Sequence, residues 1–314
     1  MLVVATRDDR WGLQHFFPEA LREAGHPLAE RLELVIDPRL ELPFRDRLPE
    51  LGAVILFAQD PLGPLYPDVY RYALELERLC DEAGVPLVNR PEPLSRTCKS
   101  MQLLLLRRAG LDAPRAVRLS HWRDALDDGL VPYPLFLRYD CGHASDEEGF
   151  AGPFATAGEL SRARLPERDA WPTLRHLAGV AAVEFLETRS ADGLYRTLRT
   201  WVVGDSVIRS RLTVARVWHG HRPTVADREL FRDEITAVLH GTPDAAEREL
   251  AREASRATGL AIVAIDHGVT RDGRHVVYDV NPYPAALPWW SGDLVFRRRA
   301  VDAFAAFLER LAPA

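Results

Sequence analysis

Short apolar runs alternate with amphipathic stretches through the N-terminal part of the chain. Residues 67–84 repeat apolar positions at helical spacing and end at Gly84, which predicts an α-helix. Apolar runs separated by helices are typical of buried parallel strands, so this part predicts a small, doubly wound parallel sheet. The expected strands are residues 2–6, 32–36, 53–58 and 85–89.

The pattern changes after Pro91. Ser95 is a suitable N-cap for a helix that runs to Gly110. Beyond it, two strand-like runs meet at Gly204-Asp205, which is typical of a hairpin. The second part therefore predicts an α+β region with antiparallel strands and a last helix. The expected segments are strands at 134–139, 180–186, 195–204, 205–212, 260–269 and 274–281, and a helix at 293–311.

Composition limits the class of protein. The chain has 314 residues, enough for two domains or one large α/β unit, and a net charge of −6. That charge argues against a general nucleic-acid binder or membrane-surface binder. No apolar stretch approaches the ~20 residues that span a bilayer, and the N-terminus reads as a strand rather than a signal peptide. We expect a cytoplasmic protein without a nucleic-acid or membrane partner.

The three cysteines are widely spaced. Cys80, Cys98 and Cys141 form no CxxC pair. This spacing fits a reducing compartment and predicts neither a structural zinc site nor a disulfide framework.

Lys99 is the only lysine among the 40 lysine and arginine residues. Lysine is a compact point charge, whereas arginine is a wide planar fork. Lys99 is therefore either a chance survivor on a helix surface or a cation at a position where only a point charge fits.

Three oxygen-bearing side chains gather near the C-terminal end. Asp279 and Asn281 are two residues apart on one expected strand, so they face the same way. A paired strand can bring Asp266 beside them. Two carboxylates and an amide oxygen suit Mg²⁺ carrying a nucleotide phosphate, although three such residues can also form a solvated sheet edge.

Other charged and small residues suit phosphate binding. Arg138 ends a strand and is followed by the small residues Gly142 and Ser145, a plausible phosphate cradle. Arg199 and Arg211 lie on the two arms of the hairpin, where they can bind phosphate oxygens or form surface ion pairs. The signatures GxGxxG, GxxxxGK[ST], GxSxG and HExxH are absent.

The order of these segments resembles the ATP-grasp superfamily, especially its peptide-bond-forming ligases such as those that add glutamate to a ribosomal protein. The matching segments run from about Asn89 to Pro284. They are "NRPEP" with the helix that carries Lys99, "EFLE", "RTWVVGD", and "AIDHG…YDVNPYP".

The resemblance implies an ATP-grasp domain at residues 93–314, with a lid at about 115–185, after a pre-ATP-grasp α/β domain at 1–92. It implies that Lys99 and Arg138 contact phosphates, with Arg138 at a position usually held by lysine. Asp279 stands where the family usually has glutamate. The other implied roles are a phosphate loop at Gly142–Ser145, an adenine hinge at Glu184, Phe185 and Leu186 with Glu187 or Asp192 as the ribose partner, catalytic Arg199 and Arg211, and metal ligands Asp266, Asp279 and Asn281.

The implied activity is an ATP-dependent carboxylate–amine ligase that forms an amide through an acyl phosphate and releases ADP and phosphate. ATP and Mg²⁺, or Mn²⁺ in its place, are the expected cofactors. The expected partners are a small-molecule or peptide carboxylate and an amine, with a homodimer as the expected assembly. The alternatives are a nucleotide-binding regulatory or scaffold protein without turnover, and a small-molecule kinase on the same fold.

Overall fold

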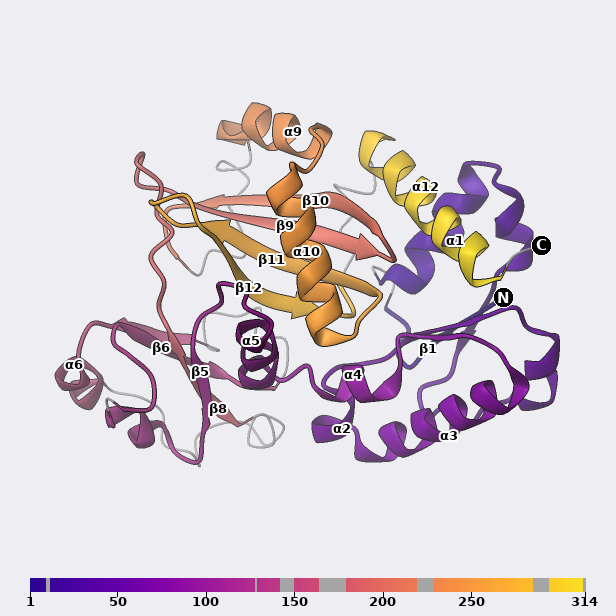
Figure 1. The fold of residues 1–314 in the computed structure, drawn as a ribbon, viewed down its shortest axis with the longest axis horizontal. Helices are drawn as coiled ribbons and strands as arrows, with labels where there is room; N and C mark the ends of the chain where they lie inside the picture. The colour runs from indigo at the N-terminus through magenta and orange to yellow at the C-terminus, as the bar shows by residue number, and fades with distance from the viewer. Residues whose placement is uncertain are drawn as a thin grey trace.

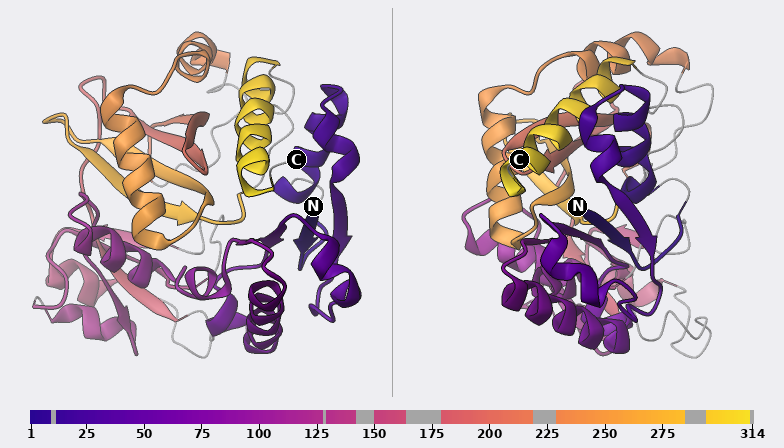
Figure 2. Two further views of the ribbon diagram at one scale, coloured as in Figure 1. Left: turned by 45° about the vertical axis from the view of Figure 1, so that its right-hand side comes forward. Right: turned by 90° about the vertical axis from the view of Figure 1, so that its right-hand side faces the viewer.

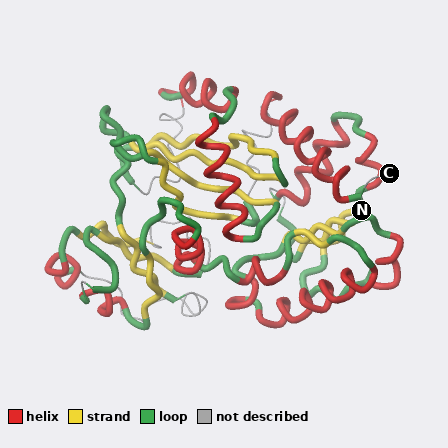
Figure 3. The backbone as a smooth tube through the Cα atoms, viewed as in Figure 1, coloured by secondary structure: helices red, strands yellow, loops and turns green. Residues whose placement is uncertain are grey.

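Three four-stranded sheets form the framework of the molecule (Figure 1). In this computed structural model, the described residues are 1–9, 12–127, 129–141, 150–163, 179–218, 229–284 and 294–312. None of the helices within those ranges is both long and apolar enough to cross a membrane. Figure 3 shows helices lying against the sheets, with the two chain ends close together.

The first sheet is parallel, with strand order β2-β1-β3-β4, which confirms the prediction for the N-terminal part. Apolar residues of α1 pack on one face and those of α3 on the other. Gly84 ends α3 in the left-handed conformation (φ 69°) that glycine adopts readily. The elements are β1 (Leu2–Ala5), α1 (Leu13–Glu23), η1 (Pro27–Arg31), β2 (Glu33–Ile36), η2 (Arg45–Glu50), β3 (Val54–Phe57), α2 (Leu62–Leu65), α3 (Pro67–Ala83) and β4 (Leu87–Val88).

The predicted single helix from Ser95 to Gly110 is two helices, α4 (Pro91–Ser95) and α5 (Lys99–Arg108). The expectation that Ser95 caps a helix is wrong. Its hydroxyl donates to the carbonyl of Glu92 at 2.7 Å, and Cys98 occupies the N-cap position of α5. Lys99 is therefore the first residue of α5.

The second sheet is antiparallel, with order β5-β8-β6-β7. Its strands surround a separate apolar cluster that includes Trp122, Leu135 and Leu160. Figure 1 shows this sheet away from the first one, on the far side of α5. The elements are β5 (Ala116–Leu119), η3 (Trp122–Leu126), β6 (Leu135–Tyr139), β7 (Phe150–Phe154), α6 (Ala157–Arg162) and β8 (Val180–Glu184).

The third sheet is also antiparallel, with order β10-β9-β11-β12, and its hairpin turns at Gly204-Asp205 as predicted. α10 crosses one face (Figure 1), while apolar residues of α12 pack against the other face. The elements are β9 (Tyr195–Val203), β10 (Ser206–Ala215), α9 (Arg232–His240), α10 (Ala245–Thr258), β11 (Ile262–Val269), β12 (His275–Asn281) and α12 (Leu294–Leu311).

The C-terminal helix joins the first and third sheets. The rings of Phe17 in α1 and Phe304 in α12 stack with centroids 4.0 Å apart, and Trp201 of β9 meets Phe17 edge-on at 5.9 Å. Both views in Figure 2 show α12 lying between the N-terminal region and the third sheet. Such aromatic contacts bury a large apolar area, so they hold the two sheets in one arrangement.

Asn89 makes a second connection between the same two sheets. Its amide nitrogen donates to the carbonyl of Ile262 at 2.8 Å, and its amide oxygen accepts from the backbone N–H groups of Ala261 and Ile262 at 2.8 and 3.1 Å. Asn89 is 2% exposed, so these backbone groups depend on the side chain rather than on water.

We predict that Asn89→Ala lowers the free energy of unfolding by about 2–3 kcal/mol, because the buried backbone groups at the start of β11 lose their partner. Urea unfolding at neutral pH measures the change. The exposed Arg96–Glu92 ion pair supplies a control: Glu92→Gln should change the same free energy by less than about 0.5 kcal/mol. Equal effects of the two variants would contradict the bridging role.

Candidate functional site

A row of four charged residues crosses one face of the third sheet. Arg211 is directly opposite Arg199, Arg199 is opposite Asp266, and Asp266 is opposite Asp279. Residues paired in this way share a face of the sheet. The predicted approach of Asp266 and Asp279 is therefore confirmed, and the two arginines of the hairpin lie in line with them. We call Arg211, Arg199, Asp266 and Asp279 the charged row.

Irregularities in the strand pairing position the two ends of this row. Arg209 is opposite Thr200 and Arg211 is opposite Arg199, with Ser210 as the extra residue between them. Because Thr200 and Arg199 are neighbours on a strand and face opposite ways, this bulge turns Arg209 and Arg211 to opposite faces. A similar shift at Tyr278 accompanies the pairing of Asp279 with Asp266.

The centre of the row is a bidentate ion pair. Nε and Nη2 of Arg199 each donate to one carboxylate oxygen of Asp266 at 2.6 Å; the Asp266 side chain is buried, and that of Arg199 is only 13% exposed. Burial lowers the pKa of Arg199, but the Asp266 charge outweighs that effect and the net shift is upward. Arg199 therefore keeps its positive charge beside the Asp266 carboxylate. The alternative of an ion pair on an exposed sheet surface is wrong for Arg199, because this pair is largely shielded from solvent.

Arg211 has a less favourable environment. Its Nη2 lies 3.9 Å from Asp266, and its buried Nε atom has no hydrogen-bond partner among the described residues. Burial and the neighbouring Arg199 charge lower the pKa of Arg211 to about 10. The guanidinium is thus a largely buried cation beside a like charge. Its Nε–H group is a donor that an anion could use.

Lys99 approaches the row from α5 at the edge of the sheet. Its ammonium forms an ion pair with Asp279, and the residue is 2% exposed, so it is not a surface survivor. Gln102, one helical turn later, donates to the carbonyl of Val280 at 2.6 Å and accepts from its N–H at 3.3 Å. This spacing places both side chains against β12.

Arg138 contributes a further cation from the second sheet. Burial lowers its pKa, while the charges of Asp279, Asp140 and Asp266 act in the opposite direction. Asp279, which also pairs with Lys99, has the largest of these opposing effects, so Arg138 faces the same charged region as Lys99. The structure therefore brings together Lys99, Arg138 and the charged row.

The predicted metal ligands fit a hard cation by their chemistry. Burial raises the pKa of Asp279, but Lys99 and Arg138 outweigh it and the net shift is downward, so the carboxylate is charged. Asp266 lies opposite it, and two facing carboxylates are suitable oxygen ligands for Mg²⁺. Asn281 is on the same strand, with its amide oxygen accepting from the N–H of Tyr283 at 2.9 Å.

The predicted adenine hinge links the second and third sheets. Glu184 ends β8 and accepts from the N–H of Arg115 at 2.9 Å, while the N–H of Phe185 donates to the carbonyl of Pro134 at 2.8 Å. Leu186 is partly buried, and exposed Glu187 accepts from the N–H of Arg189 at 2.8 Å. The Phe185 N–H is thus already used within the protein.

Sequence reasoning missed two features near these residues. The side chain of Gln102 makes the hydrogen bonds to the Val280 backbone that a neighbouring strand would otherwise make at the edge of β12. No sequence signal distinguishes Gln102 from an ordinary helix residue. Trp218 packs against Phe136 and Phe185, with ring centroids 4.6 and 5.5 Å apart. Gly142 and Ser145 of the predicted phosphate loop lie outside the described residues.

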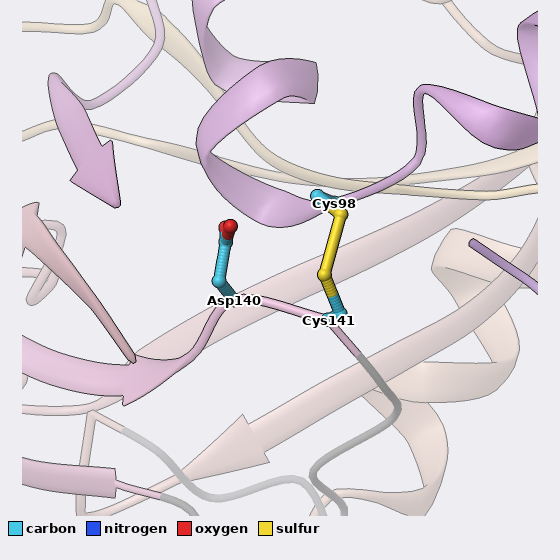
Figure 4. A group of neighbouring side chains, drawn as sticks. All are labelled: Cys98, Asp140 and Cys141. Carbon is cyan, nitrogen blue, oxygen red and sulfur yellow. A yellow bond between two sulfur atoms is a disulfide. The ribbon is translucent and has the colours of Figure 1, made fainter. Parts of the chain in front are cut away.

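The expectation that the chain contains no disulfide is wrong. Cys98 and Cys141 form one, across a sequence separation of 43 (Figure 4). Cys80 is free and buried. The fold brings together two cysteines that the linear spacing kept far apart.

No protein-family model and no curated protein matches the chain. Solved structures do. The ATP-grasp ligase PsnB, complexed with a minimal precursor, aligns over 98% of this chain and 98% of its own, with a TM-score of 0.56 and 18% identity. The chain has the ATP-grasp fold.

Two other ATP-grasp structures support this assignment. A RimK domain ATP-grasp protein from Sphaerobacter thermophilus aligns over 98% of this chain and 99% of its own, with a TM-score of 0.54 and 19% identity. Biotin carboxylase from Campylobacter jejuni covers 96% of this chain and 70% of its own, with a TM-score of 0.55 and 13% identity. The predicted fold is confirmed.

We predict that Arg211→Met raises the free energy of unfolding by about 1–3 kcal/mol, because it removes a buried cation that faces a like charge. Arg209, two residues away, provides the matched control: it forms a bidentate pair with buried Glu247. Arg209→Met should instead lower the same free energy by about 3–5 kcal/mol. Urea unfolding of both variants measures the contrast, and destabilisation by Arg211→Met would contradict it.

Proposed function

We propose that this protein is an ATP-dependent carboxylate–amine ligase that forms an amide through an acyl phosphate. The charged row carries the proposal. Its cations lie in line with two carboxylates suited to Mg²⁺, and Lys99 of α5 and Arg138 of β6 add positive charge. The ATP-grasp fold supports the same proposal, because the sequence resemblance to that superfamily implies nucleotide-binding roles for these residues.

The cations of the site are paired with carboxylates that a bound nucleotide and its metal ion could replace as partners. Lys99 neutralises Asp279, and Arg199 neutralises Asp266. Four cations, Lys99, Arg138, Arg199 and Arg211, then lie near the carboxylates of Asp266, Asp279 and Asp140, and they favour binding of the anionic phosphates of Mg·ATP. Phosphate oxygens can take over the cations when the carboxylates take the metal ion.

The proposed chemistry needs positioning and electrostatics rather than a side-chain nucleophile. A substrate carboxylate attacks the γ-phosphate of ATP, giving an acyl phosphate and ADP, and an amine then displaces phosphate to form the amide. Arg199 and Arg211 would bind the transferring phosphoryl group, whose negative charge they stabilise. Mg²⁺, held by Asp266, Asp279 and Asn281, would neutralise phosphate charge.

We propose that the adenine of the nucleotide binds near the segment that joins the second and third sheets. Phe185, Phe136 and Trp218 form an aromatic group there, and such groups favour contact with a flat base. Glu187 is exposed in the same segment, where its carboxylate can accept hydrogen bonds from a ribose. Asp192 is a poorer ribose partner because Arg196 binds both of its oxygens.

Peptides are suitable candidates for one substrate. PsnB has been solved with a precursor peptide, and it aligns over nearly the whole of this chain. Arginines in the charged row also favour an anionic carboxylate donor. We propose a peptide or small-molecule carboxylate, a separate amine, and action in the cytoplasm.

Hydroxylamine provides a direct test, because it traps an acyl phosphate as a hydroxamate without the natural amine. We expect ADP release and hydroxamate formation when the protein meets Mg·ATP, hydroxylamine and a panel of acidic amino acids and peptides. Arg199→Gln should lower both rates by at least about 100-fold. Arg196→Gln, on the same strand but outside the charged row, is the matched control and should retain most of the activity.

Calorimetric titration with Mg·ATP separates the alternatives. Nucleotide binding without ADP release across the panel would favour the regulatory or scaffold protein. Transfer of phosphate to a hydroxyl group, with no hydroxamate, would favour a kinase. A protein that binds no nucleotide would contradict the proposed function altogether.

A further inference from the structure

The disulfide joins two parts of the candidate nucleotide site. Cys98 is the N-cap residue of α5 and directly precedes Lys99, while Cys141 follows the end of β6, three positions after Arg138. The bond therefore connects the helix that carries one phosphate-binding cation to the strand that carries the other. Figure 4 shows it beside Asp140, between the start of α5 and the end of β6.

Non-covalent contacts hold the same junction together. The N–H of Ser100 donates to Oδ1 of Asp140 at 2.7 Å, its hydroxyl donates to Oδ2 at 3.0 Å, and the N–H of Lys99 donates to the Asp140 carbonyl at 2.7 Å. Asp140 is fully buried. These bonds can bring Cys98 and Cys141 together without the disulfide, and their Cα atoms are 4.7 Å apart, within the range that a disulfide spans.

The surroundings favour thiol chemistry rather than metal binding. Asp140 is the nearest further ligand, but both of its oxygens already accept hydrogen bonds from Ser100. Cys98 lies at a helix N-terminus, and Nη1 of Arg118 is 4.0 Å from the sulfur of Cys141. Both features stabilise a thiolate, the form of cysteine that exchanges with disulfides.

We propose that Cys98 and Cys141 are a reversible redox switch for the nucleotide site, a proposal that rests on the proposed function. In this proposal, Lys99 and Arg138 turn from the carboxylates to the phosphates of Mg·ATP, and α5 and β6 shift relative to each other as they do so. A covalent bond between the two elements opposes this shift. The dithiol form therefore binds nucleotide more tightly than the disulfide form.

The switch is a balanced exchange with a disulfide of the glutathione class. A Cys141 or Cys98 thiolate attacks oxidised glutathione and releases one glutathione thiol. The second cysteine then attacks the mixed disulfide and releases another. The protein loses two electrons and two protons, and two molecules of reduced glutathione carry them away.

The test compares Mg·ADP binding by the intact protein after reduction with dithiothreitol and after oxidation with oxidised glutathione. Mass spectrometry confirms the loss of two hydrogen atoms and the Cys98–Cys141 link. We expect the reduced form to bind Mg·ADP at least about fivefold more tightly, the lower end of usual coupling between two sites. Equal affinity, tighter binding by the oxidised form, or failure of the disulfide to form would overturn the switch.

The double variant Cys98→Ser/Cys141→Ser is the control. Serine is a good N-cap residue at position 98, and the variant still contains the free Cys80. It should bind Mg·ADP with the same affinity before and after oxidation. A response in this variant would assign the effect to Cys80 and overturn the proposal. If neither redox form of the unaltered protein binds Mg·ADP, the proposed function itself fails, which is a different result from equal binding.

Linkage supplies a second readout that needs no activity. If the two redox forms differ fivefold in affinity, saturating Mg·ADP must shift the thiol–disulfide equilibrium in a glutathione buffer fivefold toward the dithiol. Thiol counting with and without Mg·ADP measures that ratio. An equilibrium unaffected by bound nucleotide would contradict the switch.

Discussion

The buried pair between Arg199 and Asp266 is the interaction on which the rest of the site depends. It lies in the middle of the third sheet, where direct register between β9 and β11 brings the two side chains together. Arg211 and Asp279 extend the row by one strand on each side. Like charges opposite each other on a sheet are unfavourable, so this row stabilises the fold less than an apolar face would. We interpret that loss as a requirement of ligand binding.

The faces of the third sheet differ because one strand irregularity separates two arginines. Arg209 turns toward α10 and forms a closed structural pair with Glu247, whereas Arg211 turns toward Asp266 with a buried Nε group unused among the described residues. The first arrangement satisfies its buried polar atoms, whereas the second leaves Nε of Arg211 without a hydrogen-bond partner among the described residues. Asn89 and α12 hold the first sheet against the third.

Much of this architecture was predictable, and the exceptions have physical reasons. Apolar runs and glycines predicted the parallel sheet, the hairpin and most strand positions, because those signals are local. The pairing of Asp266 with Asp279 followed from their strand positions. Ser95 was wrong as a cap because Pro91 starts a separate short helix. Gln102 and the Cys98–Cys141 bond depend on contacts between segments far apart in the chain, which spacing alone does not reveal.

A lysine-acylating ATP analogue can show whether Lys99 lies at the phosphates of a bound nucleotide. Lys99 is the only lysine, so apart from the N-terminal amine it is the one site for a stable acyl label. We expect a label on Lys99, located by mass spectrometry, that excess Mg·ATP suppresses. No label, or a label that Mg·ATP leaves unchanged, would contradict a nucleotide site at the charged row.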